Sequence, residues 1–234
     1  AIEPLENAAD LGGGNALCYH TYVTAAPTLA GRYALYEQIA AGGMATVHLG
    51  ELVGPVGFSR TVAIKRLHGN YAKNSSFVAM FVDEARLAAR INHPNVVQTL
   101  DVVTSQGELF VVMDYVNGES LDRLVARAKQ RGEKIPPRIA VAIVVATLHG
   151  LHAAHETVGA DGERLDIIHR DVSPHNILVD ATGIAKLIDF GVAKASGRVQ
   201  TTAEGQIKGK LSYMAPEQFR GEKVTTSVDT FGAG

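Results

Sequence analysis

Four groups of residues have the types and spacing of chemically active sites, and they follow one another along the chain. They are a glycine turn at 39–47, a V-A-I-K run ending at Lys65, an H-R-D-x-x-x-x-N segment at 169–176, and a D-F-G triplet beginning at Asp189. Glycines let backbone N–H groups approach phosphate oxygens, lysine neutralises phosphate charge, and carboxylates bind divalent cations. The set therefore indicates a site for a phosphate-bearing ligand and a metal ion.

Each group taken alone is weak evidence. Ala40 and Ala45 replace two glycines of the full G-x-G-x-x-G-x-V pattern, and a plain β-turn would explain that segment equally well. Lys65 would be a solvated strand residue unless a carboxylate pairs with it, and Glu84 is placed to do so on the following helix. Single triplets recur by chance, but the whole series in this order, followed by A-P-E at 215–217, argues against chance.

Composition excludes several classes of function. The chain has 234 residues, 46% of them hydrophobic, and a formal net charge of −2, which offers no basic surface for nucleic acid and no polybasic membrane patch. A single cysteine, Cys18, excludes an internal disulfide framework and a cysteine-based zinc site. The longest apolar run, within 139–148, is shorter than the roughly 20 residues that cross a bilayer and predicts a buried helix.

Hydrophobic periodicity predicts an α+β chain with two lobes. Strands are expected at 33–39, 45–53, 60–67, 96–103, 108–115, 177–180 and 185–188, and helices at 76–91, 120–131 and 137–157. Ser75 or Ser76 is expected to cap the first helix, and residues 105–107 to form a turn between two strands. We expect a flexible segment at 1–31, an N-lobe at 32–116 with a hinge near 114–118, and a C-lobe at 117–234.

The motifs resemble those of the Hanks-type (eukaryotic-like) Ser/Thr protein kinases, in particular their bacterial branch, over residues 33–234. The bacterial character comes from G-G-M-A at 42–45, H-P-N-V-V at 93–97 and A-P-E-Q at 215–218. The resemblance implies a bilobal fold with an antiparallel-sheet N-lobe carrying one helix and a mostly helical C-lobe. It implies transfer of the γ-phosphate of ATP, with Mg²⁺ or Mn²⁺, to Ser or Thr of protein substrates in the cytoplasm.

The same resemblance assigns roles to individual residues. Asp171 would accept or orient the substrate hydroxyl proton, Lys65 would position the phosphates, and Asn176 with Asp189 would bind the metal ion. Asp229 would brace the catalytic loop by accepting backbone hydrogen bonds. The residues expected around ATP are Ile39, Gly42, Gly43, Val47, Ala63, Lys65, Glu84, Met113 as gatekeeper, Asp114, Val116 and Leu178, with His169 and Phe190 in a hydrophobic spine that links the lobes.

Two positions depart from the family pattern. Ser173 stands where Ser/Thr kinases usually carry a lysine two residues after the catalytic aspartate, and Lys210 stands where they usually carry a threonine. In the family fold these two side chains lie side by side against that aspartate. One hypothesis is that the positions have exchanged roles, so that Lys210 is catalytic. The alternative is that Lys210 is a surface loop residue and Ser173 a tolerated loss.

Other segments leave alternatives open. Residues 157–166 are longer than the usual connection and predict an exposed hairpin, either inert or a docking site. His149, His152 and His155 recur along one helix, where a packed core helix explains them better than a metal site. The chain begins at Ala1 and stops at Gly234, so we expect a fragment of a longer protein. A membrane anchor outside it and dimerisation both stay open.

The resemblance also implies a mode of regulation, and two alternative functions remain open. Arg170 would pair with a phosphorylated activation-loop residue, for which Thr201 and Thr202 are the candidates beside Arg198. A pseudokinase or nucleotide-binding scaffold is the main rival, supported by the lost glycines, Ser173 and the early chain end. A tyrosine kinase is the second rival, because that class also lacks the lysine, although its catalytic loop has a different pattern.

Overall fold

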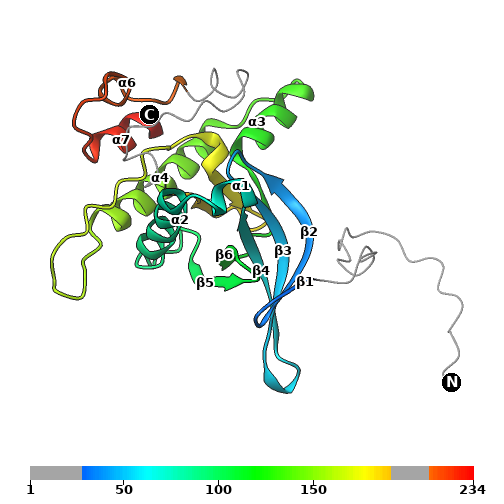
Figure 1. Cartoon of the computed structure of the whole chain (residues 1–234). Coiled ribbons are helices and arrows are strands. Elements are labelled where there is room, and N and C mark those ends of the chain that lie inside the picture. Colours follow the sequence, from blue (N-terminus) through cyan, green and yellow to red (C-terminus); the bar gives the residue numbers. More distant parts are fainter. Residues whose placement is uncertain (1–27, 191–210) are drawn as a thin grey trace, which may run out of the picture.

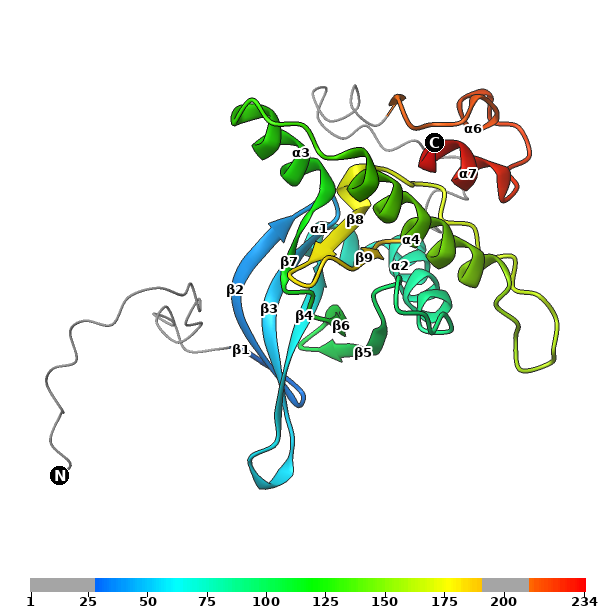
Figure 2. The same cartoon turned by 180° about the vertical axis from the view of Figure 1, so that it is seen from behind.

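The computed structural model describes residues 28–190 and 211–234, which form a strand-rich lobe and a helical lobe. In Figure 1 the blue-to-green sheet lies on one side and the green-to-red helices on the other, and the view from behind in Figure 2 shows the same division. The predicted α+β, bilobal class is therefore confirmed. Residues 1–27, which make up most of the predicted flexible segment, lie outside the described part of the chain.

The N-lobe is built on one antiparallel sheet whose strand order is β1-β2-β3-β4-β6-β5. The strands are β1 (Thr28–Ala30), β2 (Tyr33–Ala41), β3 (Ala45–Val53), β4 (Ser59–Leu67), β5 (Thr99–Ser105) and β6 (Glu108–Asp114). Alternating side chains of β2, β4 and β6 form a buried core that consists of Tyr33, Leu35, Val62, Ile64, Phe110 and Val112. The sheet confirms the strands that the sequence predicted here, because their β-branched and apolar residues fit a half-buried pleated surface.

Two details at the edges of this sheet differ from the prediction or sharpen it. β1 lies inside the segment assigned to a flexible lead-in, because Ala30 pairs with Tyr33 across a tight turn at Gly31, whose φ is +63°. The predicted turn between β5 and β6 is confirmed. Gln106 and Gly107 both have positive φ there, as a two-residue hairpin connection requires.

Helix α2 (Ser75–Ala88) packs on the sheet and carries Glu84. Its N-cap is Asn74, whose side chain accepts a hydrogen bond from the backbone N–H of Ser76 at 3.0 Å, so the predicted serine cap is wrong. Asn74 has the extended backbone that a capping residue needs, whereas Ser75 and Ser76 are already helical. The inner face of α2 joins a second N-lobe core formed by Ala45, Leu67, Phe81, Ala85, Leu109 and Val111. Two short elements, η1 (Pro55–Gly57) and α1 (Gly69–Ala72), were not predicted.

The C-lobe places a small sheet, with strand order β7-β8-β9, against helices. Its elements are β7 (Gly118–Ser120), α3 (Leu121–Gln130), α4 (Pro137–His155), η2 (Pro174–Asn176), β8 (Ile177–Asp180), β9 (Ala185–Leu187), α6 (Pro216–Arg220) and α7 (Ser227–Ala233). α3, α4, β8 and β9 lie where the periodicity placed them, within two residues at their ends, whereas β7, η2, α6 and α7 were not predicted. The predicted hairpin at 157–166 is also present, with Val158 bridged to Arg164, and it projects from the lobe in both views (Figures 1 and 2).

The predicted buried helix in the C-lobe is buried on one face only. α4 packs on β9 and the catalytic loop through Ile143, Thr147, Gly150, Leu151 and Ala154. Its other face exposes apolar side chains, among which Val141 is 61% exposed. By length and composition alone α4 could cross a membrane, but its inner face belongs to the core of the lobe, as in the helices of soluble domains.

Candidate active site

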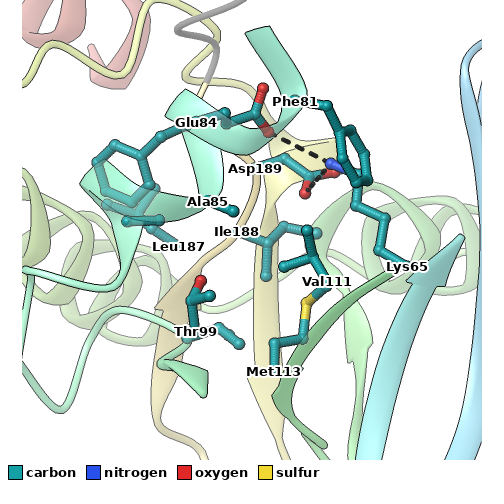
Figure 3. Close-up of a pocket in the computed structure, with 13 residues that line it drawn as sticks. Lys65, Phe81, Glu84, Ala85, Thr99, Val111, Met113, Leu187, Ile188 and Asp189 are labelled. Atoms are coloured by element: carbon teal, nitrogen blue, oxygen red, sulfur yellow. Dashed lines mark hydrogen bonds and ion pairs between the residues drawn. The ribbon is translucent and has the colours of Figure 1, made fainter. Parts of the chain in front are cut away.

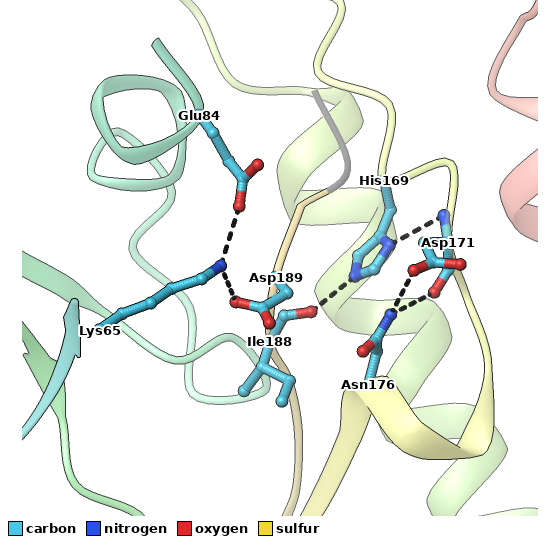
Figure 4. Close-up of polar contacts among 7 residues, drawn as sticks. All are labelled: Lys65, Glu84, His169, Asp171, Asn176, Ile188 and Asp189. Carbon is cyan, nitrogen blue, oxygen red and sulfur yellow. Dashed lines mark hydrogen bonds and ion pairs between the residues drawn. The ribbon is translucent and has the colours of Figure 1, made fainter. Parts of the chain in front are cut away.

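Lys65 joins the two lobes at the centre of the candidate site. Its Nζ donates to Oε1 of Glu84 on α2 at 3.3 Å and to Oδ1 of Asp189, two residues beyond β9, at 2.8 Å. Figure 3 and Figure 4 show the ammonium group between the two carboxylates. The Lys65 side chain is 16% exposed and that of Asp189 is 42% exposed, so the cluster is sheltered at the lysine and opens toward the aspartate.

The charges of this cluster stabilise one another. Burial alone would lower the pKa of Lys65, but the negative charges of Asp189 and Glu84 outweigh it and raise that pKa above its ordinary value. Burial acts to raise the pKa of Asp189, and the positive charge of Lys65 overcomes this and holds it below its usual range. The lysine is therefore charged and the aspartate ionised at neutral pH, as phosphate and metal binding require.

The catalytic loop orders Asp171 through two neighbours. Nδ2 of Asn176 donates to the backbone oxygen of Asp171 at 2.7 Å and to its Oδ2 at 3.0 Å. The backbone N–H of Asp171 donates to Nδ1 of His169 at 3.3 Å, and Nε2 of His169 contacts the carbonyl oxygen of Ile188 at 3.0 Å. Because a carbonyl only accepts, His169 carries its proton on Nε2, and the ring links Asp171 to the residue before Asp189 (Figure 4).

The carboxylate of Asp229, on α7, holds the backbone of the catalytic loop by hydrogen bonds. This carboxylate is fully buried and accepts the backbone N–H groups of His169 at 2.8 Å and Arg170 at 2.7 Å. Arg170 has a φ of +64°, a conformation that is strained for an arginine. The two hydrogen bonds compensate for that strain, in agreement with the bracing role that the resemblance implied for Asp229.

His155 is a site residue that sequence reasoning missed. Its Nε2 lies 2.7 Å from Oδ2 of Asp229 and so supplies the buried carboxylate with a third partner. His149 and His152, grouped with it by sequence, are exposed on α4. The position of His155 on its helix could not indicate this contact, because its partner Asp229 follows 74 residues later in the chain.

The residues expected around ATP do not all line one cavity. Lys65, Glu84, Met113 and Asp189 line a common pocket, which continues past Met113 to Thr99 (Figure 3). Val47 lies on β3 and Ala63 on β4, Leu178 lies on β8, and Ile39, Gly42 and Gly43 lie in β2 and its turn. Asp114 and Val116 line a separate groove at the hinge, where the Asp114 carboxylate pairs with Arg60 at 2.5 Å.

The donor set fits a magnesium ion. Asn176 uses its amide nitrogen to hold Asp171, which leaves the amide oxygen as a potential ligand beside the ionised carboxylate of Asp189. Oxygen ligands from amides and carboxylates are those that Mg²⁺ prefers. Asn176 and Asp189 would therefore hold the ion that neutralises phosphate charge.

The part of the site that would bind the phosphate-accepting hydroxyl lies only partly within the described residues. Lys210, Thr201 and Thr202, together with Gly191 of the D-F-G triplet, lie outside the described residues. Ser173 is 2% exposed, and among the described residues its Oγ is the one buried side-chain oxygen without a hydrogen-bond partner. Nε2 of Gln218 on α6 donates to the backbone oxygen of Arg170 at 2.9 Å and thus joins the A-P-E-Q segment to the catalytic loop.

The buried His169 predicts a pH dependence of stability. Burial lowers its pKa below the ordinary value of about 6.5. As the pH falls through that value, the unfolded chain binds a proton that the folded protein does not, so the free energy of unfolding should decrease by up to about 1.4 kcal/mol per pH unit. Urea unfolding between pH 7.5 and 5.5 should show a shallower dependence for His169→Gln than for the control His68→Gln. Equal slopes in the two variants would contradict this assignment.

Comparison with known proteins agrees with this geometry. The family model of the protein kinase domain matches residues 33–234. The chain is 40% identical to the tyrosine-protein kinase MasK of Myxococcus xanthus, over 87% of this chain and 32% of that protein. It is 35% identical to the serine/threonine-protein kinase PknB of Mycobacterium leprae, over 91% of this chain and 32% of that protein.

Solved structures give the same result at the level of the fold. The crystal structure of the kinase domain of Mycobacterium tuberculosis PknI superposes with a TM-score of 0.66 at 27% identity, covering 91% of this chain and 74% of that one. The chain spans about a third of the length of the two curated relatives, at 32% of each. The fold, the motifs and the family match agree, and the chain belongs to the protein kinase domain family.

Proposed function

We propose that this protein is an ATP-dependent kinase that transfers the γ-phosphate to the hydroxyl of Ser or Thr in protein substrates. The observation that carries the proposal is a pair of ordered groups, which the ring of His169 links through the carbonyl oxygen of Ile188. In one group Lys65 bonds both Glu84 and Asp189, and in the other Asn176 orders Asp171. Phosphoryl transfer needs such positioning and charge stabilisation more than it needs covalent chemistry.

Each residue has a separate task in this mechanism. Lys65 neutralises the α- and β-phosphates, and Glu84 keeps its side chain extended toward the cleft. Asp171 accepts the proton of the acceptor hydroxyl. The oxygen of that hydroxyl forms a bond to the γ-phosphorus, and the bond between this phosphorus and the ADP oxygen breaks. Asn176 and Asp189 bind Mg²⁺, or Mn²⁺ in its place, which neutralises the developing charge when it is present.

The same proposal includes a role for each part of the chain and a location for the domain. Residues 32–116 would bind the nucleotide and 117–234 the protein substrate, with 1–31 as a lead-in. The kinase domain would act in the cytoplasm, where ATP is available. A pseudokinase is the weaker alternative, because all four of these site residues are present, Lys65 in contact with Asp189 and Asn176 in contact with Asp171.

A tyrosine acceptor is a second candidate, which two observations favour. The position two residues after Asp171 holds the buried Ser173 in place of the usual lysine of Ser/Thr kinases. MasK, at 40% identity, carries the name of a tyrosine-protein kinase, whereas PknB at 35% is named for serine and threonine. Several Ser/Thr-named relatives favour the first candidate, and the acceptor can be measured directly.

A phosphate-transfer assay tests the activity and the acceptor together. Peptide libraries that offer Ser, Thr or Tyr are incubated with Mg-ATP, and the phosphorylated amino acid is identified. Label on Ser and Thr is expected, and Asp171→Asn should reduce turnover roughly 10²- to 10⁴-fold because it removes the proton acceptor. Label on Tyr alone would establish the second candidate. The absence of transfer by the unaltered protein, with nucleotide still bound, would establish the pseudokinase.

The exchange of Ser173 and Lys210 gives a second prediction. Ser173 is buried, and its hydroxyl is neutral, so it cannot supply the missing positive charge. If Lys210 supplies it, Lys210→Ala should lower turnover by about a hundredfold, the order expected for one lost electrostatic donor. The double change Ser173→Lys with Lys210→Thr should restore most of that loss. Lys208→Ala, two residues earlier in the chain, serves as control, and full turnover by Lys210→Ala would exclude the exchange.

Activation by phosphorylation gives a third prediction. We expect Thr201 or Thr202 to acquire phosphate in the presence of Mg-ATP and to pair with Arg170, which orders the activation loop. Phosphopeptide mapping should find label at one of them, and Arg170→Gln should remove the gain in turnover that this phosphate brings. Ser196 and Ser212 are the controls, since label confined to them would exclude the assignment.

A further inference from the structure

The loop between α2 and β5, residues 89–98, contacts three separate parts of the site and is called the junction loop here. It lies between the helix that carries Glu84 and the strand that begins at Thr99, which is visible at the edge of the pocket in Figure 3. One contact is with β9, one with the hinge and one with the end of α2. Each of these parts positions a different group of the proposed nucleotide site.

The contact with β9 is the most extensive. The backbone N–H of Val97 donates to Leu187 at 2.9 Å, and the N–H of Leu187 donates to Asn95 at 2.8 Å. Nδ2 of Asn95 and Nζ of Lys186 add hydrogen bonds to backbone oxygens on the opposite segment at 2.8 and 2.7 Å. Because β9 ends two residues before Asp189, these bonds fix the strand that presents the metal-binding carboxylate.

Gln98 makes the other two contacts. Its backbone oxygen accepts the N–H of Asp114, at the start of the hinge, at 3.0 Å. Its side-chain Nε2 donates to the carbonyl oxygen of Ala89, the C-cap residue of α2, at 3.2 Å and to that of Thr99 at 3.2 Å. The C-terminal carbonyls of a helix lack partners within the helix, so this side chain ties an otherwise open end of α2 to the hinge.

This hydrogen bond matters because the C-terminal end of α2 influences where the carboxylate of Glu84 lies. Only Phe81 and Ala85 of this helix are buried. Glu84 precedes Ala89 by five residues, about 7.5 Å along the axis, so a small shift of the C-terminus moves its carboxylate relative to Lys65.

We propose that Gln98 is a positioning residue that couples α2 to the hinge, so that nucleotide bound at the hinge also orders the Lys65–Glu84 pair. Gln98 lines the groove at the hinge, and it acts on α2 through its bonds to Ala89 and Asp114. The inference rests on the proposed function, because it requires a nucleotide at the hinge.

Hydrogen exchange with a non-hydrolysable Mg-ATP analogue tests the coupling. In the unaltered protein, the analogue should protect amides both in the hinge at 112–116 and in α2 (Ser75–Ala88). Gln98→Leu keeps the backbone bond to Asp114 and a similar volume but removes the amide. Protection of the hinge should persist. The protection of α2 that the analogue brings should fall about three- to tenfold, the factor that corresponds to the loss of one hydrogen bond.

Two further variants and a kinetic measurement make the test specific. Gln98→Lys keeps a donor and should preserve the coupling, and Gln130→Leu makes the same chemical change at an exposed position at the end of α3. For Gln98→Leu, kcat should fall by about the same factor while the KM for ATP changes less than about twofold.

The possible outcomes separate the inference from the function on which it rests. Equal protection of α2 in Gln98→Leu and in the unaltered protein would overturn the coupling alone. Loss of hinge and α2 protection together in the variant would mean that Gln98 only stabilises the fold, which also overturns the coupling. If the analogue protects neither segment in the unaltered protein, both the coupling and nucleotide binding at this site are wrong.

Discussion

The arrangement of this domain depends on one charge that must be neutralised away from bulk water. The ammonium group of Lys65 is mostly sheltered, so burial acts to lower its pKa, and the carboxylates of Asp189 and Glu84 outweigh that effect. Glu84 comes from a helix of the N-lobe and Asp189 from a loop of the C-lobe, so satisfying this charge requires the two lobes to meet. The position of α2, the end of β9 and the orientation of the lobes are all conditions for that one interaction.

A second buried charge supports the catalytic loop in the same way. Asp229 is completely buried, and it is tolerated because two backbone N–H groups and His155 bond to its oxygens. Its removal would leave Arg170 in a strained conformation without compensation. The loop that carries Asp171 is thus held from α7 and α4, while the ring of His169 connects it to the segment that carries Asp189.

The two halves of the site differ in how completely they follow the family pattern. The nucleotide side keeps its lysine and carboxylates and brings them into contact. On the acceptor side, the position of the usual lysine is filled by Ser173, which is buried and has an unpartnered Oγ within the described structure. A missing positive charge beside a transferring phosphate costs catalysis unless another residue replaces it.

The sequence by itself determined the order of the elements and the chemical identity of the site, because strand periodicity, helix periodicity and motif spacing are local properties. It placed β2 to β6, α3 and α4, and it proposed as site residues Lys65, Glu84, Asp171, Asn176 and Asp189, between which the structure shows contacts. It misplaced the cap of α2, which Asn74 fills, and it missed His155 and Gln98. Those roles depend on partners that the fold supplies: the buried Asp229 distant in sequence for His155, and the end of α2 and the hinge for Gln98. Only the tertiary structure decides which polar groups are buried together, and hence which side chains must pair.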